Sequence, residues 1–118
     1  MTGLSHFLVA AVLSTEYAIG VRNGCFCAHP YVLRLLKISD AVAWSWRKQV
    51  ISGVRAHLPG LLRISFGCYN SREEVDVLVR ALRNIAAGEI RGDYEQDAAS
   101  GRFAERTFKP DLAEYFRL

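Results

Sequence analysis

Two thiols, a histidine and an arginine lie within eight consecutive positions of this 118-residue sequence. Arg22 ends a short apolar segment, and Cys25, Cys27 and His29 follow on a turn that begins with Asn23-Gly24. A neighbouring cation stabilises a thiolate relative to the thiol, and the thiolate is the nucleophilic form. The spacing therefore predicts a reactive cysteine presented by a turn after a strand.

A second arginine, Arg63, lies within a later apolar segment over residues 61–66. A planar guanidinium can bind a carboxylate through two parallel hydrogen bonds, which fixes the orientation of the bound molecule. A strand that carries such an arginine next to the cysteine turn would combine a carboxylate-binding group with a nucleophile.

These residues belong to a longer pattern. The run Gly20-Val21-Arg22-Asn23-Gly24-x-x-Cys27-Ala28-x-Pro30 precedes Arg63-Ile64-Ser65, which precedes Tyr69-Asn70-Ser71-x-Glu73-Glu74-Val75-Asp76. This order of motifs resembles the C-terminal small domain of the class V aminotransferase family, the fold-type I pyridoxal-phosphate (PLP) enzymes that include the cysteine desulfurases. The resemblance covers roughly residues 4–87 of the sequence.

The resemblance implies roles for three residues. Cys27 matches the catalytic cysteine of the desulfurases, which takes sulfur from a cysteine substrate. Arg63 matches the arginine that binds the α-carboxylate of the amino-acid substrate, and Arg22 matches an arginine near the active-site entrance. The stretch between Cys27 and Arg63 is longer than in the familiar desulfurases, and Cys25-Phe26 replaces polar positions. Aminotransferase, epimerase and lyase chemistry therefore stay open beside desulfuration.

The cofactor implied by the resemblance is PLP, bound in the full-length enzyme by a lysine and a phosphate loop of a large domain. Lys37, Lys48 and Lys109 lie in no matching motif, and no glycine-rich phosphate loop is present. We therefore interpret the chain as a fragment that shares its active site with a missing large domain, and expect it neither to bind PLP nor to catalyse alone. A homodimer is one further assembly that the resemblance allows.

A second interpretation comes from a different class of protein. The same cysteine turn suits a stand-alone thiol-bearing binding module or sulfur carrier without catalysis. Such a module would contact a partner through the surface that a large domain would otherwise cover.

The other polar candidates are interpreted more simply. The pattern Cys25-x-Cys27-x-His29 has a one-residue spacing that differs from the usual spacing of zinc ligands, and we expect no metal site. Cys25 is expected to be structural or a resolving thiol, and His29 to pack against the helix that follows it. Cys68 is expected at the end of a buried strand and to be less reactive than Cys27. Structural roles are predicted for His6 and His57, and Trp44 and Trp46 are predicted to be core and interface aromatics.

Composition excludes several classes of function. The net charge is +3, and the arginines alternate with acidic residues rather than forming a stripe, so we expect no nucleic-acid partner. The apolar run over 7–13 is too short to span a membrane. Three cysteines do not form a disulfide framework, which favours the reducing cytoplasm.

The periodicity predicts an α+β fold in which strands near 18–22 and 61–66 are adjacent in one small sheet with helices packed on one face. Residues 1–88 are predicted to form the family-like small domain, and 89–118 a polar C-terminal extension. Asp76 and Arg80 are placed to pair across one helical turn. Helices are predicted over about 6–16, 31–37, 40–57 and 71–87, a hairpin around Ser100-Gly101, and a final helical turn over 110–118.

Overall fold

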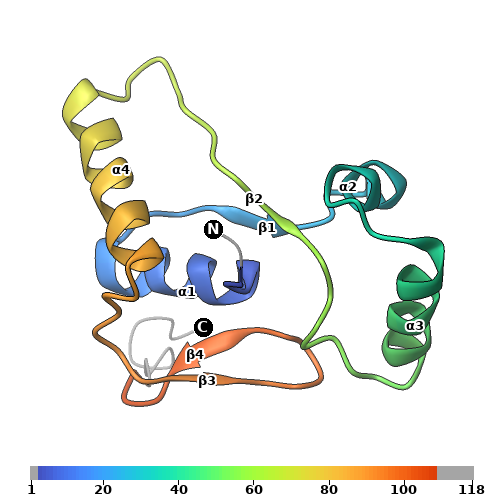
Figure 1. Ribbon diagram of the computed structural model, residues 1–118. Coiled ribbons are helices and arrows are strands. Elements are labelled where there is room, and N and C mark those ends of the chain that lie inside the picture. The colour runs from blue at the N-terminus through green and yellow to red at the C-terminus, as the bar shows by residue number, and fades with distance from the viewer. Residues whose placement is uncertain (1–2, 109–118) are drawn as a thin grey trace, which may run out of the picture.

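The computed structural model describes residues 3–108 and has the predicted α+β architecture (Figure 1). Within these residues, four helices are combined with two small antiparallel sheets of two strands each. In chain order the elements are α1 (His6–Tyr17), β1 (Arg22–Gly24), α2 (His29–Leu35), α3 (Asp40–Ile51), β2 (Leu61–Arg63), α4 (Arg72–Ala86), β3 (Tyr94–Gln96) and β4 (Phe103–Glu105).

The core lies between α1 and α4. Helix α1 begins where the Ser5 side chain accepts a hydrogen bond from the Phe7 N–H, as a serine N-cap does. It ends at Ala18, which adopts a left-handed conformation and donates its N–H to the Leu13 carbonyl. The fully or nearly fully buried side chains of the two helices form one cluster: Val9, Val12, Leu13, Leu78, Ala81 and Ile85.

Helix α4 follows the sequence prediction closely. Ser71 and Glu74 form the predicted capping box, in which each side chain accepts a hydrogen bond from the other residue's backbone N–H. The buried residues of α4 recur on one face of the helix and pack on α1. The predicted Asp76–Arg80 ion pair does not form. The ion pairs found within residues 3–108 are those of Arg106.

Strands β1 and β2 are paired, as predicted, but both are shorter than expected. The antiparallel register places Arg22 opposite Arg63, Asn23 opposite Leu62 and Gly24 opposite Leu61. The first strand is displaced toward the cysteine turn because residues 18 and 19 both donate backbone hydrogen bonds to Leu13 at the end of α1. Helix α1 packs against this pair of strands.

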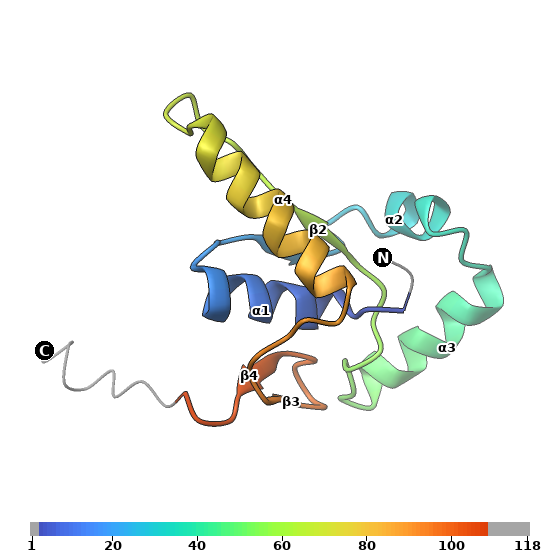
Figure 2. The same ribbon diagram turned by 60° about the vertical axis from the view of Figure 1, so that its left-hand side comes forward.

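Helices α2 and α3 lie to one side of the α1–α4 core (Figures 1 and 2). Pro30 occupies the first turn of α2, where its missing N–H has no helical partner to lose. Helix α3 ends at Ile51, earlier than the predicted His57, because Gly53 has a positive φ of 87°. No residue of α3 is fully buried, so the helix contributes little to the core.

A hairpin of β3 and β4 forms around Ser100-Gly101, as predicted, and it is joined to α1. Glu16 Oε1 accepts hydrogen bonds from the Arg91 and Gly92 N–H groups, both at 3.0 Å, and from the Tyr94 hydroxyl at 3.1 Å. Burial and the hydrogen bond to Glu16 raise the pKa of Tyr94 to about 12.

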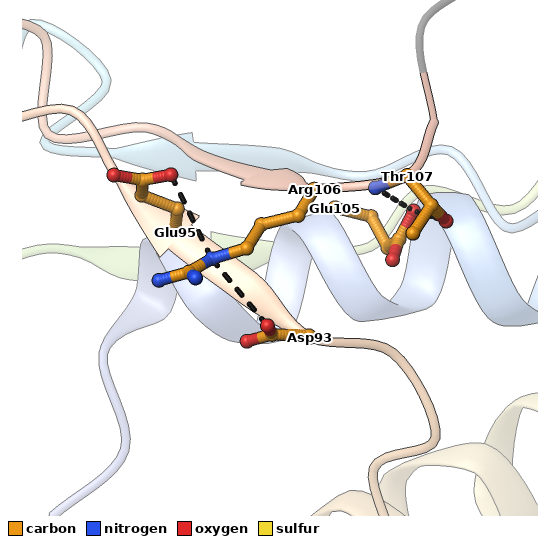
Figure 3. A network of polar contacts seen from close by, with 5 residues as sticks. All are labelled: Asp93, Glu95, Glu105, Arg106 and Thr107. Atoms are coloured by element: carbon orange, nitrogen blue, oxygen red, sulfur yellow. Dashed lines mark hydrogen bonds and ion pairs between the residues drawn. The ribbon is translucent and has the colours of Figure 1, made fainter.

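On the outer side of the hairpin, Arg106 Nε lies 3.4 Å from Asp93 Oδ2 and 3.7 Å from Glu95 Oε2 (Figure 3). These carboxylates and the guanidinium are exposed, so the pairs contribute little stability. The predicted helical turn over 110–118 lies outside the described residues, and the division at residue 88 stays a prediction.

Candidate functional site: a strained cysteine turn beside two arginines

The turn that carries Cys27 connects β1 to α2 and has an unusual backbone. Phe26 and Cys27 both have positive φ, 52° and 59°, and Gly24, two residues before Phe26, has φ of 116°. The Ala28 N–H donates to the Cys25 carbonyl at 2.8 Å and closes the turn. Glycine adopts this conformation freely, whereas a residue with a Cβ pays a steric cost of roughly 1–3 kcal/mol.

The Cys27 residue of this turn is exposed. Cys27 is a free, exposed cysteine in the structure, as expected for a reactive thiol. Strained backbone is concentrated at functional sites, because surrounding structure must hold it in place. Two successive non-glycine residues with positive φ therefore mark this turn as a candidate site on structural grounds alone.

The two predicted arginines are brought together by the strand register. Arg22 and Arg63 are direct partners in the antiparallel pair, so their side chains project from the same face of the ladder. Both residues are exposed, and within residues 3–108 neither pairs with a carboxylate. Like charges in direct opposition are unfavourable, and a bound anion would relieve this repulsion.

Arg63 also contacts the cysteine turn. Its guanidinium carbon lies 5.4 Å from the centre of the Phe26 ring, within cation–π range. Phe26 immediately precedes Cys27 in the turn, so Arg63 contacts the neighbour of the thiol-bearing residue. Arg63 thus reaches the cysteine turn, whereas the Arg22–Arg63 pair itself lies at the end of the ladder opposite the Gly24–Leu61 pair, from which the turn continues.

Cys25 has a different environment from Cys27. It is half-buried, and its Sγ donates a hydrogen bond to the Pro59 carbonyl at 3.2 Å. Burial raises the pKa of the Cys25 thiol and keeps it protonated. The contact joins the cysteine turn to the segment that leads into β2, which supports the expected structural role.

His6 contacts the same segment that leads into β2. Its Nε2 lies 3.0 Å from the Leu58 carbonyl oxygen, and the ring packs so close to Gly60 that a Cβ there would lie 2.5 Å from Nε2. Burial lowers the pKa of His6, with a smaller opposing effect from the Leu58 hydrogen bond. These contacts span more than fifty residues of sequence, and no local pattern indicates them.

The expected position of Cys68 at the end of a buried strand was wrong, while its lower reactivity stays a prediction. Strand β2 ends at Arg63, and Cys68 is an exposed residue of the turn before α4. Exposure therefore does not separate Cys68 from Cys27, and the difference between them lies in the strained turn and the adjacent arginines.

A cavity of about 880 Å³ lies next to the cysteine turn, and sequence reasoning missed it. Cys25 and His29 line its near side, with residues of α2, α3 and the segment 55–59 around them. Trp44 and Trp46, predicted as core and interface aromatics, both line this cavity. The closely spaced Trp44 and Trp46 were the available sequence signal.

The sequence matches the family model described as aminotransferase class-V over residues 1–78, about two thirds of the chain. The chain belongs to the class V aminotransferase family. No curated protein and no solved structure matches it. The family match covers the cysteine turn, both arginines of the ladder and the start of α4.

Enzymes of the class V aminotransferase family are PLP-dependent, so we asked whether the described residues fit this cofactor. PLP enzymes hold the cofactor as a Schiff base with a lysine. Lys37 and Lys48 are exposed, and neither lines the cavity beside the cysteine turn; Lys109 lies outside the described residues. Residues 3–108 therefore do not fit covalent attachment of PLP.

Two further features bear on the class of protein. In the described part of the chain, no group of three or more His, Cys, Asp or Glu residues could hold a metal ion. None of the helices there has the length and hydropathy needed to cross a membrane.

Proposed function

We propose that this class V aminotransferase chain supplies a carboxylate-binding arginine pair and a nucleophilic thiol to an active site completed by a separate PLP-binding domain. Arg63, assisted by Arg22, binds the α-carboxylate of an amino-acid substrate. Cys27 is the thiol that meets the substrate side chain. The partner that completes the site contributes the cofactor lysine, which the described residues lack.

The register of β1 and β2 is the observation that carries this proposal. It sets two exposed arginines directly opposite each other, with no carboxylate from residues 3–108 to neutralise them. A carboxylate accepts hydrogen bonds from a guanidinium in a paired geometry, which orients the substrate as well as binding it. The cation–π contact between Arg63 and Phe26 keeps one of these arginines beside the cysteine turn.

The thiol position supports the second part of the proposal. Cys27 is exposed, and it lies on strained backbone that the flanking β1 and α2 hold in place. Cys25, two residues away, is held by Pro59 and is a poorer nucleophile because burial raises its pKa. Cys27 is thus the more exposed of the two neighbouring thiols.

The proposal is tested by steady-state kinetics of the holoenzyme that contains this chain, with amino acids including cysteine as substrates. Arg63→Ala should lower kcat/KM by roughly 30-fold or more, because truncating one partner of a hydrogen-bonded charge pair costs about 2–5 kcal/mol. Arg63→Lys should restore part of this loss. Arg83→Ala, on an exposed position of α4, is the matched control.

Variants of Cys27 then separate the reactions. Cys27→Ser should abolish sulfide release from cysteine if the reaction is desulfuration, and should leave transamination, epimerisation or lyase activity largely intact. An Arg63→Ala enzyme as active as the Arg83→Ala control would overturn the proposal for the carboxylate site.

A sulfur-carrier function is the second candidate, favoured by an exposed, strained Cys27 in a segment that does not fit the cofactor. Polysulfide treatment of the 118-residue chain, followed by mass mapping, tests it. A persulfide that forms on Cys27 and passes to an acceptor thiol without any PLP-binding domain would support the carrier. Persulfide spread equally over Cys27 and Cys68 would count against it.

A further inference from the structure

We propose that the cavity between α2, α3 and the segment 55–59 is a binding site for a small organic anion with an aromatic body, of the aryl-alkanoate type. This site is separate from the arginine pair of the β1–β2 ladder and goes beyond the proposed function. It lies on the other side of the cysteine turn, where Cys25 rather than Cys27 forms part of the wall.

The size and walls of the cavity suit an organic molecule. Its volume of about 880 Å³ lies within the range of about 300–1,000 Å³ that is typical of small-molecule pockets. The walls are mostly apolar, with Trp44 and Trp46 from α3 and Leu33 from α2 among them. Trp44 is 59% exposed, and this large apolar surface gains most from burial by a ligand.

The charges of the cavity select an anion. Arg47 and Arg55 line it, against a single acidic residue, Asp40. Asp40 lies in the first turn of α3, where the free backbone N–H groups of the helix already interact favourably with its carboxylate. Neither arginine pairs with a carboxylate of residues 3–108, so the cavity carries uncompensated positive charge.

Contacts within the protein hold both arginines in position. The Arg47 guanidinium carbon lies 5.4 Å from the centre of the Trp44 ring, which joins the cation to the aromatic wall. Arg55 donates from Nη1 to the Ala99 carbonyl at 3.3 Å, and its backbone N–H donates to Ala98 at 2.9 Å. A guanidinium has five N–H donors, so each arginine retains donors for a ligand.

The remaining polar groups do not oppose an anion. The Cys25 thiol is protonated and directed to the Pro59 carbonyl, so it adds no negative charge. His29, which also lines the wall, carries no negative charge. An aromatic ring against the tryptophans and a carboxylate at the arginines would therefore satisfy both halves of the cavity.

The chain contains an internal reporter for this site, because its two tryptophans both line the cavity. Hydrocinnamate has an aromatic ring and a carboxylate, and hydrocinnamamide is its neutral analogue. Neither absorbs strongly where tryptophan is selectively excited. We expect hydrocinnamate to change the tryptophan emission of the 118-residue chain with saturation, and to bind about tenfold more tightly than the amide.

Matched variants locate the binding. Arg47→Ala and Arg55→Ala should each weaken hydrocinnamate binding about tenfold and leave the amide unaffected, while Arg80→Ala, exposed on α4, should change neither. Ala43→Phe, which fills the cavity from α3, should abolish binding of both ligands. Circular dichroism of each variant verifies that the helices are retained.

The proposal is overturned if the emission change does not saturate, if acid and amide bind equally, or if Arg80→Ala weakens binding as much as Arg47→Ala does. Cys27→Ser should leave binding unchanged. The measured binding of hydrocinnamate is therefore independent of whether the active-site proposal holds.

Discussion

Replacing Gly101 with alanine tests how the hairpin is joined to the rest of the protein. Gly101 lies in the turn of the β3–β4 hairpin, with φ of 76°, and is buried against the segment that follows α3. A Cβ built there would lie 2.7 Å from the Arg55 carbonyl oxygen and 2.9 Å from two ring atoms of Phe7. The oxygen belongs to the backbone, so a side-chain rotation cannot relieve the contact.

Gly88 provides the matched control. Its φ of 81° is close to that of Gly101, but a Cβ there would have no atom within 4 Å. The left-handed conformation alone costs roughly 1–2 kcal/mol for a residue with a Cβ. Overpacking adds about 1–3 kcal/mol, and only at Gly101. We therefore expect losses of about 1–2 kcal/mol for Gly88→Ala and about 2–5 kcal/mol for Gly101→Ala.

Urea unfolding followed by far-ultraviolet circular dichroism measures both losses, provided the slope of free energy with urea is unchanged. The informative quantity is the difference between the two variants, because the conformational cost cancels. Equal losses for Gly88→Ala and Gly101→Ala would refute the close packing of the hairpin against Arg55 and Phe7.

Three further outcomes are expected. Because burial lowers the pKa of His6, the contribution of His6 to stability is complete above about pH 6.5 and is lost as the pH falls below that value. His6→Gln should remove this pH dependence from the free energy of unfolding measured between about pH 6.5 and 5. His57→Gln, at an exposed position, should leave the dependence in place. Ser71→Ala should lower the free energy of unfolding by about 0.5–2 kcal/mol through loss of the α4 cap, measured by urea unfolding. Iodoacetamide should alkylate Cys25 more slowly than Cys27 near pH 8, by mass mapping, because burial raises the pKa of Cys25 and its Sγ bonds to Pro59.

Local signals were sufficient to predict the elements whose stability is local. The Ser71-x-x-Glu74 box and the one-face apolar stripe predicted α4, and the structure has both. Ser100-Gly101 predicted the turn of the hairpin, where the positive φ of Gly101 is required. Ser5 predicted the start of α1 because an N-cap needs only the next few residues.

The strand limits depended on tertiary contacts that the sequence does not reveal. The apolar run from Ala18 was expected to pair, but its first residues complete the end of α1, and pairing begins at Arg22. Strand β2 is limited to the three residues that β1 offers as partners. Cys68 was expected at the end of a buried strand, but β2 ends earlier and Cys68 is exposed.

The candidate site was predicted in part. The motif indicated Cys27, Arg22 and Arg63; the structure places the two arginines directly opposite each other and brings Arg63 against Phe26 of the cysteine turn. Their roles in an active site stay predictions. The Cys25–Pro59 hydrogen bond joins residues 34 positions apart and has no local signal. The neighbouring cavity likewise depends on how α3 folds back beside the turn.

The most direct test of the central claim compares two alkylating agents on the 118-residue chain. Iodoacetate carries a carboxylate that Arg63 and Arg22 would attract to Cys27, whereas iodoacetamide is its neutral analogue. Mass mapping gives the ratio of the two rates at each cysteine. We predict that this ratio is about fivefold higher at Cys27 than at exposed Cys68, as one close charge interaction of about 1 kcal/mol implies. We predict further that Arg63→Ala lowers the Cys27 ratio toward that of Cys68; equal ratios at the two cysteines, unchanged by Arg63→Ala, would contradict the claim that the arginine pair and Cys27 form one site.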